Sequence, residues 1–400
     1  MKEYTALALC AVGAEKVVSN ELKKLTAKKG EGAPSPTPGV FTIIESAFGR
    51  VRFKTDLAGL YRALFSLRAA DRVLLEAASF PAPDFDALFD GARSVRWDDF
   101  IPRNMGIHVG KVRTNRSALR AETSIQAAVH KAAADQLCGR YGINKLPEAY
   151  AAKQAELRVY MEKDRASLLI DLAGEPLFKR GYRREGGIAP LRETTAAAII
   201  LLSGWKRKFP LYDPLCGSGT IAIEAAMYAW NLAPGIGRNF ALDDLAIGEK
   251  RTAENLRKEY AAQADFGRTI RICGSDADEN AVALAKTNAG RAVQLSRAAP
   301  QQGAALPVFS VFPMSKARPG LDEPGFIITN PPYGRRLGDG ESAEAGYRDM
   351  AVLVENFPGW KLDIICDHQG FESHFGKKAD TVREIKSGAV NACLYEYGRL

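Results

Sequence analysis

The sequence predicts an α/β protein in which a doubly wound parallel sheet follows a smaller α+β module. Three observations predict this fold. Beyond about residue 190, strands alternate with helices, which is typical of a parallel sheet with crossover helices. The predicted strand Leu211–Asp213 runs directly into a loop with Gly217 and Gly219 that opens a helix, as the first turn of a doubly wound sheet does. Two strands near the end of the chain lie close enough in sequence to form an antiparallel hairpin that closes the sheet.

The first part of the chain alternates as strand, helix, strand, strand, helix, strand, the order of a ferredoxin-like α+β unit. Its first predicted helix carries Val17, Val18, Leu22 and Leu25 at helical spacing. Residues 28–39 are rich in Pro, Gly and Lys, so we expect an exposed loop there. The predicted strands are 5–12, 41–45, 50–54 and 72–76, and the predicted helices are 14–25 and 57–67.

The module continues with a strand at 107–110, a cationic loop at 113–120 and a helix from about Thr123. Two further strands follow at 156–161 and 166–172. We expect the domain division near residues 160 to 165, or slightly later, so that 1–160 forms one module and 165–400 the other.

In the second module, a helix is predicted from Pro190 to Leu201 and a helical insertion at about 246–263. The predicted strands are 211–213, 270–273, 308–312, 326–329 and 362–366, followed by the closing pair 381–385 and 392–397.

The composition is that of an ordinary globular chain, with 400 residues, 46% hydrophobic residues and 26% charged residues. A net charge of +8 favours a polyanionic partner, although charge alone is weak support for nucleic-acid binding. The six cysteines are scattered and the four histidines lack ligand spacing, so we expect reduced thiols, a cytoplasmic protein and no metal. No apolar stretch approaches the roughly 20 residues that a membrane span requires.

The glycine loop predicts a particular class of cofactor. No Lys-Ser/Thr pair follows it, which excludes a P-loop, and the sequence lacks the G-x-G-x-x-G fingerprint of dinucleotide sites. The carboxylate of Asp213 suits an ammonium group better than a pyrophosphate, and S-adenosylmethionine carries such an ammonium. The cofactor contacts expected from this segment are Asp213, Pro214, Cys216, Gly217, Ser218, Gly219 and Thr220.

A second acidic turn follows the next predicted strand, at Asp276-Ala277-Asp278. A carboxylate at the end of that strand can accept both hydroxyls of a ribose, and Asp276 is the candidate, with Ala277 beside it. The alternative is that Asp276 or Asp278 only caps the helix that follows.

The segment Asn330-Pro331-Pro332-Tyr333 predicts the chemistry. The Asn330 side-chain oxygen and the Pro331 carbonyl can accept the two hydrogens of an exocyclic amine, because the prolines fix the backbone and remove donors. Tyr333 can stack on the base that carries the amine. These residues suit transfer of a methyl group to N2 of guanine, to N6 of adenine or to a glutamine amide. The alternative of a different class is an RNA-binding assembly factor whose methyltransferase fold is vestigial.

Cations gather in two regions, one beside the N-terminus of a predicted helix and one in a basic connector, and both suit contacts with RNA phosphates. The expected RNA contacts are Lys111, Arg113, Arg116, Arg120, Lys131, Lys179, Arg180, Arg183 and Arg184. A solvated charged face is the alternative for the first five.

With these motifs, the chain resembles the THUMP-domain class I methyltransferases, and in particular the bacterial 23S ribosomal RNA guanine-N2 methyltransferases. The stretches that carry the resemblance are Ser117–Gln126, Gly174–Arg183, Ala189–Glu193, Asp213–Glu224 with Ala233–Gly235, Asn330–Leu337 and Leu394–Tyr397.

The resemblance implies a Rossmann-like methyltransferase domain after a ferredoxin-like part and a THUMP part, the latter at roughly 45–155. It implies S-adenosylmethionine as donor, S-adenosylhomocysteine as product, and 23S rRNA or a large-subunit precursor as partner. By the same resemblance Arg192, Glu193 and Thr194 lie near the cofactor. Phe312-Pro-Met-Ser315 stands where such enzymes commonly carry an acidic residue, so the adenine contact is made either by Ser315 or in a different way. The sequence does not indicate an oligomeric state.

Overall fold

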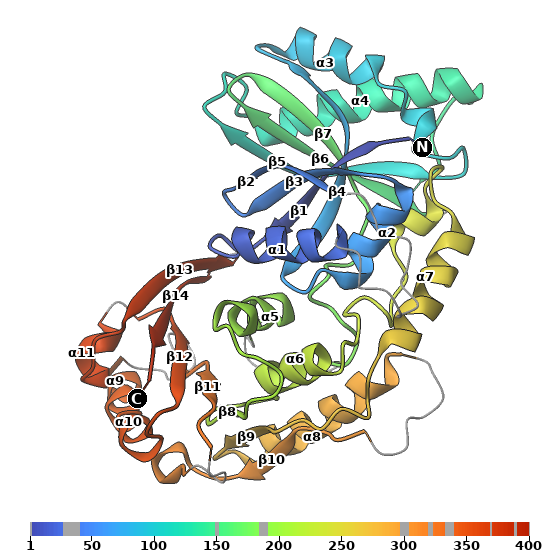
Figure 1. Cartoon of the computed structure of the whole chain (residues 1–400). Helices are drawn as coiled ribbons and strands as arrows, with labels where there is room; N and C mark the ends of the chain where they lie inside the picture. Colours follow the sequence, from blue (N-terminus) through green and yellow to red (C-terminus); the bar gives the residue numbers. More distant parts are fainter. Residues whose placement is uncertain are drawn as a thin grey trace.

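The computed structural model of this chain describes residues 2–26, 41–148, 152–183, 191–296, 304–318, 323–332, 340–368, 370–387 and 390–399, with the backbone alone at 340–343, 387 and 390. The chain forms two seven-stranded sheets, drawn one above the other in Figure 1. Among the helices in these ranges, none combines the length and the apolar composition that a bilayer-spanning segment requires.

The first sheet has the strand order β2-β3-β1-β4-β7-β6-β5. Its first four strands in sequence, with helices α1 and α2, follow the predicted ferredoxin-like order. The strands are β1 (Tyr4–Cys10), β2 (Thr42–Ala47), β3 (Arg50–Thr55), β4 (Ala70–Pro81), β5 (Gly106–Asn115), β6 (Gln154–Glu162) and β7 (Arg165–Asp171). The helices are α1 (Glu15–Thr26), α2 (Leu57–Ser66), α3 (Phe85–Ser94) and α4 (Glu122–Tyr141), with a short 3-10 turn at Trp97–Asp99.

The two faces of this sheet differ. Ala6 and Ala8 of β1 belong to the main core together with buried residues of α1, α2 and α4. Leu7 and Leu9 point the other way and form a small separate cluster with Leu74, Tyr160 and Leu169. We call the side of the sheet that carries this small cluster the open face.

One sequence prediction for this module is corrected, and one helix was missed. Strand β5 does not end at residue 110 but continues to Asn115, with a shift of register between Val109 and Lys111 across Gly110. Lys111 and Arg113 therefore lie on a strand and not in a loop. Helix α3 was not predicted. The expected loop at 28–39 lies outside the described residues.

The division between the modules lies slightly later than residues 160–165. Strand β7 pairs with both β6 and β4, so it belongs to the first sheet. A boundary at 160–165 would cut through the β6–β7 hairpin, and the first sheet instead ends at Asp171.

The second sheet has the order β10-β9-β8-β11-β12-β14-β13. Strands β10 to β12 are parallel, and β14 and β13 close the sheet as the predicted antiparallel hairpin. Strand β8 lies where the strand order reverses, which is where open α/β sheets bind ligands. The strands are β8 (Leu211–Asp213), β9 (Ile272–Asp276), β10 (Val308–Val311), β11 (Phe326–Thr329), β12 (Lys361–Cys366), β13 (Thr381–Ser387) and β14 (Val390–Tyr397).

The helices of this module include the predicted helical insertion, α7, and the helix that opens at the glycine loop, α6. They are α5 (Glu193–Leu202), α6 (Thr220–Ala229), α7 (Lys250–Gln263), α8 (Glu279–Gln294), α9 (Gly340–Asp349), α10 (Val352–Asn356) and α11 (Phe371–Phe375), with 3-10 turns at Ala241–Asp244 and Met314–Lys316.

The two modules contact each other directly. Val12 and Lys386 exchange backbone hydrogen bonds of 2.9 and 3.1 Å, which joins the first strand's end to β13, as the red hairpin beside α1 in Figure 1 indicates. The buried guanidinium of Arg68 donates to the carbonyls of Leu232, at 2.7 Å, and Met227, at 3.4 Å. The modules thus share buried polar contacts as well as apolar surface.

Candidate active site

The glycine loop lies between β8 and α6, and its two glycines have different roles. Both adopt positive φ, 50° at Gly217 and 84° at Gly219. A Cβ at Gly219 would come within 2.9 Å of the Ala285 Cβ, so this glycine lets the loop pack against α8. A Cβ at Gly217 would have no atom within 4 Å, so Gly217 borders open space.

That space is a cavity of about 460 Å³ at the carboxyl ends of β8 and β11. It joins the glycine loop to Asn330, which the sequence placed in two separate motifs. The predicted residues that line it are Asp213, Cys216, Gly217, Ser218, Thr220 and Asn330. The further lining residues are Leu191, Leu215, Ile221, Asn280, Ala281 and Leu284. They were not among the predicted contacts, because most of these side chains are apolar and carry no chemical signature.

Asp213 is a buried carboxylate at the edge of this cavity. Its Oδ1 accepts the Thr329 hydroxyl at 2.7 Å and the Leu215 N–H at 3.2 Å. Burial raises the pKa of Asp213 to about 7, and the neighbouring Asp276 adds to the rise. No cation of the described residues pairs with Asp213, so a cationic ligand group would relieve the cost of its charge.

Asp276 ends β9 beside β8, and its carboxylate supports the loop. One oxygen accepts the Gly217 N–H at 2.9 Å and the other accepts the Asp278 N–H at 3.0 Å. Asp278 caps α8 by accepting the Asn280 N–H at 2.9 Å, and it also lines the cavity. The capping alternative from the sequence is therefore confirmed for Asp278, which also borders the cavity, while Asp276 fixes Gly217 and its contact with a ribose stays a prediction.

Cys216 lines the cavity as a neutral thiol. Burial and the nearby Asp213 and Asp276 carboxylates raise the pKa of Cys216. The thiol therefore stays protonated near neutral pH and is a poor nucleophile.

Asn330 follows β11, whose pairing with β8 brings it to the same edge as Asp213. Its Oδ1 is buried and has no hydrogen-bond partner in the described part of the chain. A buried carbonyl oxygen without a partner is costly unless a ligand supplies a donor. Pro331 is buried and Pro332 half-buried, while Tyr333 lies outside the described residues.

Tyr347 of α9 supports this segment from behind. Its hydroxyl donates to the Pro332 carbonyl at 3.4 Å and accepts the Cys366 thiol at 3.5 Å, and the side chain is buried. Sequence reasoning missed Tyr347, because it lies on a different element from the motif that it contacts.

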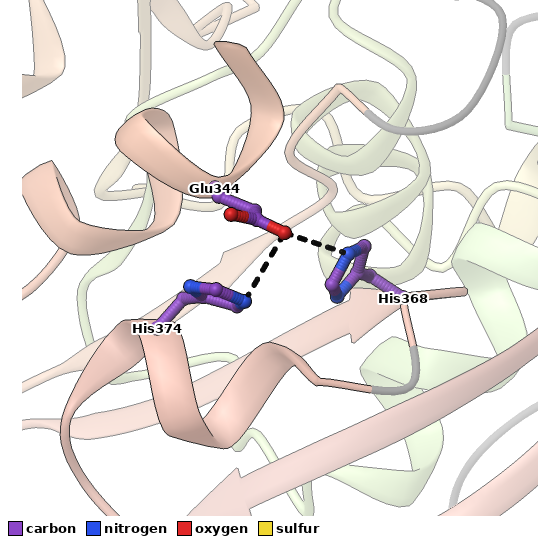
Figure 2. A group of neighbouring side chains, drawn as sticks. All are labelled: Glu344, His368 and His374. Carbon is purple, nitrogen blue, oxygen red and sulfur yellow. Dashed lines mark ion pairs between the residues drawn. The ribbon is translucent and has the colours of Figure 1, made fainter. Parts of the chain in front are cut away.

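Three potential metal ligands, Glu344, His368 and His374, lie close together beside Tyr347. Figure 2 shows Glu344 between His374, whose Nε2 is 3.4 Å from the Glu344 Oε1, and His368, at 4.0 Å. The fold brings them together although their spacing in sequence predicts no metal site. The His368 Nδ1 accepts the Gly370 N–H at 3.1 Å, which places the proton of the neutral ring on Nε2, facing Glu344. A metal at Nε2 would need that proton on Nδ1 instead, so the arrangement fits polar contacts of the two rings with Glu344 that tie α9 to α11.

Several expected cofactor contacts lie elsewhere among the described residues. Arg192 pairs with Asp71 of the first sheet at 3.2 Å, and the Thr194 hydroxyl also donates to Asp71. Glu193 is buried and pairs with Arg183 at 2.9 Å, and burial raises the pKa of Glu193 to about 7. None of the following lines the cavity: Pro214, Gly219, Asp276, Ala277, Ser315, Arg192, Glu193 and Thr194.

Two of the expected RNA contacts are corrected. Arg180 is 2% exposed, and its guanidinium donates to the Arg68 and Leu177 carbonyls, so it belongs to the interface between modules. Arg183 donates to the Thr220 hydroxyl at 3.4 Å and pairs with Glu193, so it supports the glycine loop. Arg184 lies outside the described residues.

The other expected RNA contacts lie on the first module or in the connector. Lys111 and Arg113 line one cavity on the open face. Arg116 and Arg120 follow β5, and the Arg120 Nε donates to the Ser117 carbonyl at 3.2 Å. Lys131 of α4 lies over the ring of Phe89 of α3, and Lys179 pairs with Glu175.

Comparisons with known proteins agree with this geometry. The model of a family described as "RMKL-like, methyltransferase domain" matches residues 180–396, and that of a family described as "RlmL ferredoxin-like domain" matches residues 39–74. YpsC of Bacillus subtilis (strain 168), named as a candidate RNA methyltransferase, is 34% identical over 99% of this chain and 96% of its own length. The ribosomal RNA large subunit methyltransferase K/L of Marinomonas sp. (strain MWYL1) is 28% identical over 98% of this chain, which spans 52% of that protein.

One similar solved structure contains a ligand. It is that of SMU.472, described as a candidate methyltransferase complexed with SAH, and it superposes with a TM-score of 0.85 at 32% identity. The superposition covers 100% of this chain and 99% of that one.

Proposed function

This chain belongs to the family of RMKL-like methyltransferases, and we propose that it transfers a methyl group from S-adenosylmethionine to the exocyclic N2 amine of guanine in large-subunit ribosomal RNA. The observation that carries the proposal is the unpartnered Asn330 Oδ1, which borders the same cavity as Gly217. An acceptor in that position has a use only if a ligand brings a donor to it.

The residues around the cavity fit S-adenosylmethionine. The open space at Gly217 lets a ligand approach the backbone, and Asp213 offers a carboxylate to an ammonium group. Asp278 borders the cavity, and in this proposal it replaces the predicted Asp276 as the carboxylate for the ribose hydroxyls. When bound, S-adenosylmethionine supplies an electrophilic methyl group on a sulfonium.

The chain's own residues orient the amine. Asn330 Oδ1 and the Pro331 carbonyl accept its two N–H groups, which directs the nitrogen lone pair away from these oxygens. Alignment of this kind accounts for up to about 7 to 11 kcal/mol of a barrier, and acceptors also stabilise the positive charge that develops on the nitrogen. No strong general base is needed, because the amine loses its proton only after it becomes cationic.

The choice of RNA rests on the first module and on the named relatives. A ferredoxin-like module with cations on its open face is superfluous for a protein substrate, and both the K/L relatives and YpsC carry RNA in their names. The chain spans about half the length of the K/L relatives that it matches.

Labelling with tritiated S-adenosylmethionine tests the proposal. Incubated with unmodified 23S rRNA, the protein should label the RNA, and digestion should yield N2-methylguanosine. N6-methyladenosine would move the assignment to adenine, and label in protein would move it to glutamine. No cofactor binding by calorimetry would favour a non-catalytic RNA-binding factor.

The variant Asn330→Ala should lower kcat by about 100-fold while the Kd for S-adenosylmethionine stays within about threefold, because Asn330 acts on the amine. Asn104→Ala, an exposed asparagine on the first module, is the matched control and should match the wild type. A large loss of cofactor affinity in Asn330→Ala would contradict the assigned role.

A further inference from the structure

A second cavity, of about 450 Å³, lies on the open face of the first sheet. The ends of β5 and β6 form one wall, and the turn between β2 and β3 forms the other. The Arg50–Glu162 ion pair, at 2.7 Å, joins the two walls. This cavity lies in a different module from the one that holds Asn330.

The turn between β2 and β3 presents an aromatic ring to this cavity. Phe48 is 80% exposed and adopts φ 52°, followed by Gly49 at φ 73°. Two consecutive positive φ values are those of a tight hairpin turn that favours Asn, Asp or Gly at the first position. A phenylalanine there is unfavourable for the backbone and gains little from packing, so local stability does not explain it.

Cations lie opposite this ring. Lys111 and Arg113 line the cavity, and neither forms an ion pair with a residue that the structure describes. Burial and the neighbouring Arg113, Arg158 and Arg72 lower the pKa of Lys111. Of the two carboxylates in the lining, Glu162 is held by Arg50, which leaves Glu122 against the two cations.

A buried hydroxyl completes the cavity. Tyr160 is 6% exposed, the guanidinium of Arg113 lies 5.5 Å from its ring centroid, and its hydroxyl is buried without a hydrogen-bond partner. Because buried hydroxyls are normally paired, this group is available for a polar atom of a ligand.

We propose that this cavity binds one unpaired nucleotide of the RNA substrate. The base stacks on Phe48, the phosphate lies at Lys111 and Arg113, and the Tyr160 hydroxyl pairs with a polar atom of the base or ribose. The inference rests on the proposed function in that the substrate is RNA. A single-stranded site follows from the aromatic face, since a base within a duplex cannot stack on a side chain.

Fluorescence anisotropy with the full chain tests the proposal. The probes are a labelled twelve-nucleotide RNA of mixed sequence, as a single strand and as a perfect duplex. Phe48→Asn should weaken binding of the single strand by roughly 5- to 100-fold, the effect of losing one stacked base, and leave the duplex within about twofold. The matched control is Phe85→Ala, which removes an exposed phenylalanine at the start of α3.

The asparagine variant separates binding from folding. Asparagine suits positive φ better than phenylalanine, so the Tm of Phe48→Asn should equal or exceed that of the wild type. Lys111→Ala with Arg113→Ala should reduce the salt slope for the single strand by about 1.4, whereas Phe48→Asn should leave the slope unchanged.

The proposal would be overturned if Phe48→Asn lost affinity equally for the single strand and the duplex, or lost none. It would also be overturned if the wild type bound neither RNA. The outcome is independent of catalysis, because binding is measured without S-adenosylmethionine. A wild-type protein that labels 23S rRNA while Phe48→Asn binds single strands normally would retain the proposed function and refute this site.

Discussion

At the scale of single residues, Asp213 should make cofactor binding depend on pH. The pKa of Asp213 is raised to about 7, so below pH 7 the carboxyl is protonated before it can pair with an ammonium. We expect the affinity for S-adenosylmethionine to fall by up to about tenfold per pH unit below 7. Calorimetry between pH 5.5 and 7.5 measures this dependence, and Asp213→Asn should bind weakly at all these values.

A matched variant separates Asp213 from its neighbour. The pKa of Glu193 is also raised to about 7, but Glu193 does not line the cavity. Glu193→Gln should therefore keep the acid-side loss of affinity, and its disappearance in that variant would assign the dependence to Glu193.

Stability provides a second measurement of the same group. The folded pKa of Asp213, about 7, lies above its unfolded value near 3.9. The stability that the protonated carboxyl provides is present below about pH 4 and is lost as the pH rises through 7. In the absence of cofactor, Asp213→Asn should have a higher Tm than the wild type above pH 7, and the difference should shrink toward pH 4.

Short motifs predicted some site residues correctly and misplaced others. Asp213, Gly217 and Asn330 were predicted together because each stands in a short string with few other uses, and the cavity confirms that they meet. Arg180 was placed at RNA because a run of cations looks exposed in a sequence. Its burial depends on Glu224 and on the Arg68 carbonyl, which are far from it in sequence.

At the scale of elements, α9 should position the segment that holds Asn330. Tyr347→Phe removes the hydroxyl that donates to the Pro332 carbonyl and keeps the ring. We expect a loss in kcat of roughly 3- to 10-fold, because a hydrogen bond of this kind contributes about 0.5 to 1.5 kcal/mol. The Kd for S-adenosylmethionine should not change.

The control for Tyr347 comes from the same aromatic cluster. The Tyr395 hydroxyl donates to the His368 carbonyl at 3.5 Å and has no contact with the segment at 330–332. Tyr395→Phe should therefore lower the Tm about as much as Tyr347→Phe does, and it should leave kcat unchanged. Equal kcat in the two variants would reduce Tyr347 to a packing role.

Elements were predictable where periodicity or a motif defined them. The succession of strands β8 to β14 along the chain follows from the alternation of the sequence, and α7 was expected because the two cofactor turns stand far apart. Strand β5 was cut short because Gly110 looks like a strand end, whereas in the sheet it forms a bulge and pairing with β6 continues. A glycine has both uses, and only the partner strand decides between them.

At the scale of the whole molecule, the position of the domain division could not be predicted. Strands β6 and β7 follow a long helix, and a sequence pattern does not reveal which sheet a hairpin joins. Strand β7 pairs with β4, and the paired residues lie at least 84 positions apart in sequence, as Pro81 and Arg165 do. This pairing places the hairpin in the first sheet. Long-range pairing of this kind is also why the relation of the two sheets was left open.

The two modules should unfold as one unit, because the buried Arg68 joins them. Its guanidinium satisfies two carbonyls of the second module, and its own carbonyl accepts from Arg180. Arg68→Ala removes the side-chain donor to the buried Leu232 carbonyl, whereas the Met227 carbonyl keeps the Leu232 N–H as a donor. The variant should lower the free energy of unfolding by about 1 to 3 kcal/mol. The exposed Arg96, which pairs with Asp99, gives the control Arg96→Ala, with a change within about 0.5 kcal/mol. Urea unfolding followed by far-UV circular dichroism and by tryptophan fluorescence should give one coincident transition in the wild type. Two separated wild-type transitions, or an Arg68→Ala variant as stable as the control, would mean that the modules are held together by their covalent connection and not by this contact.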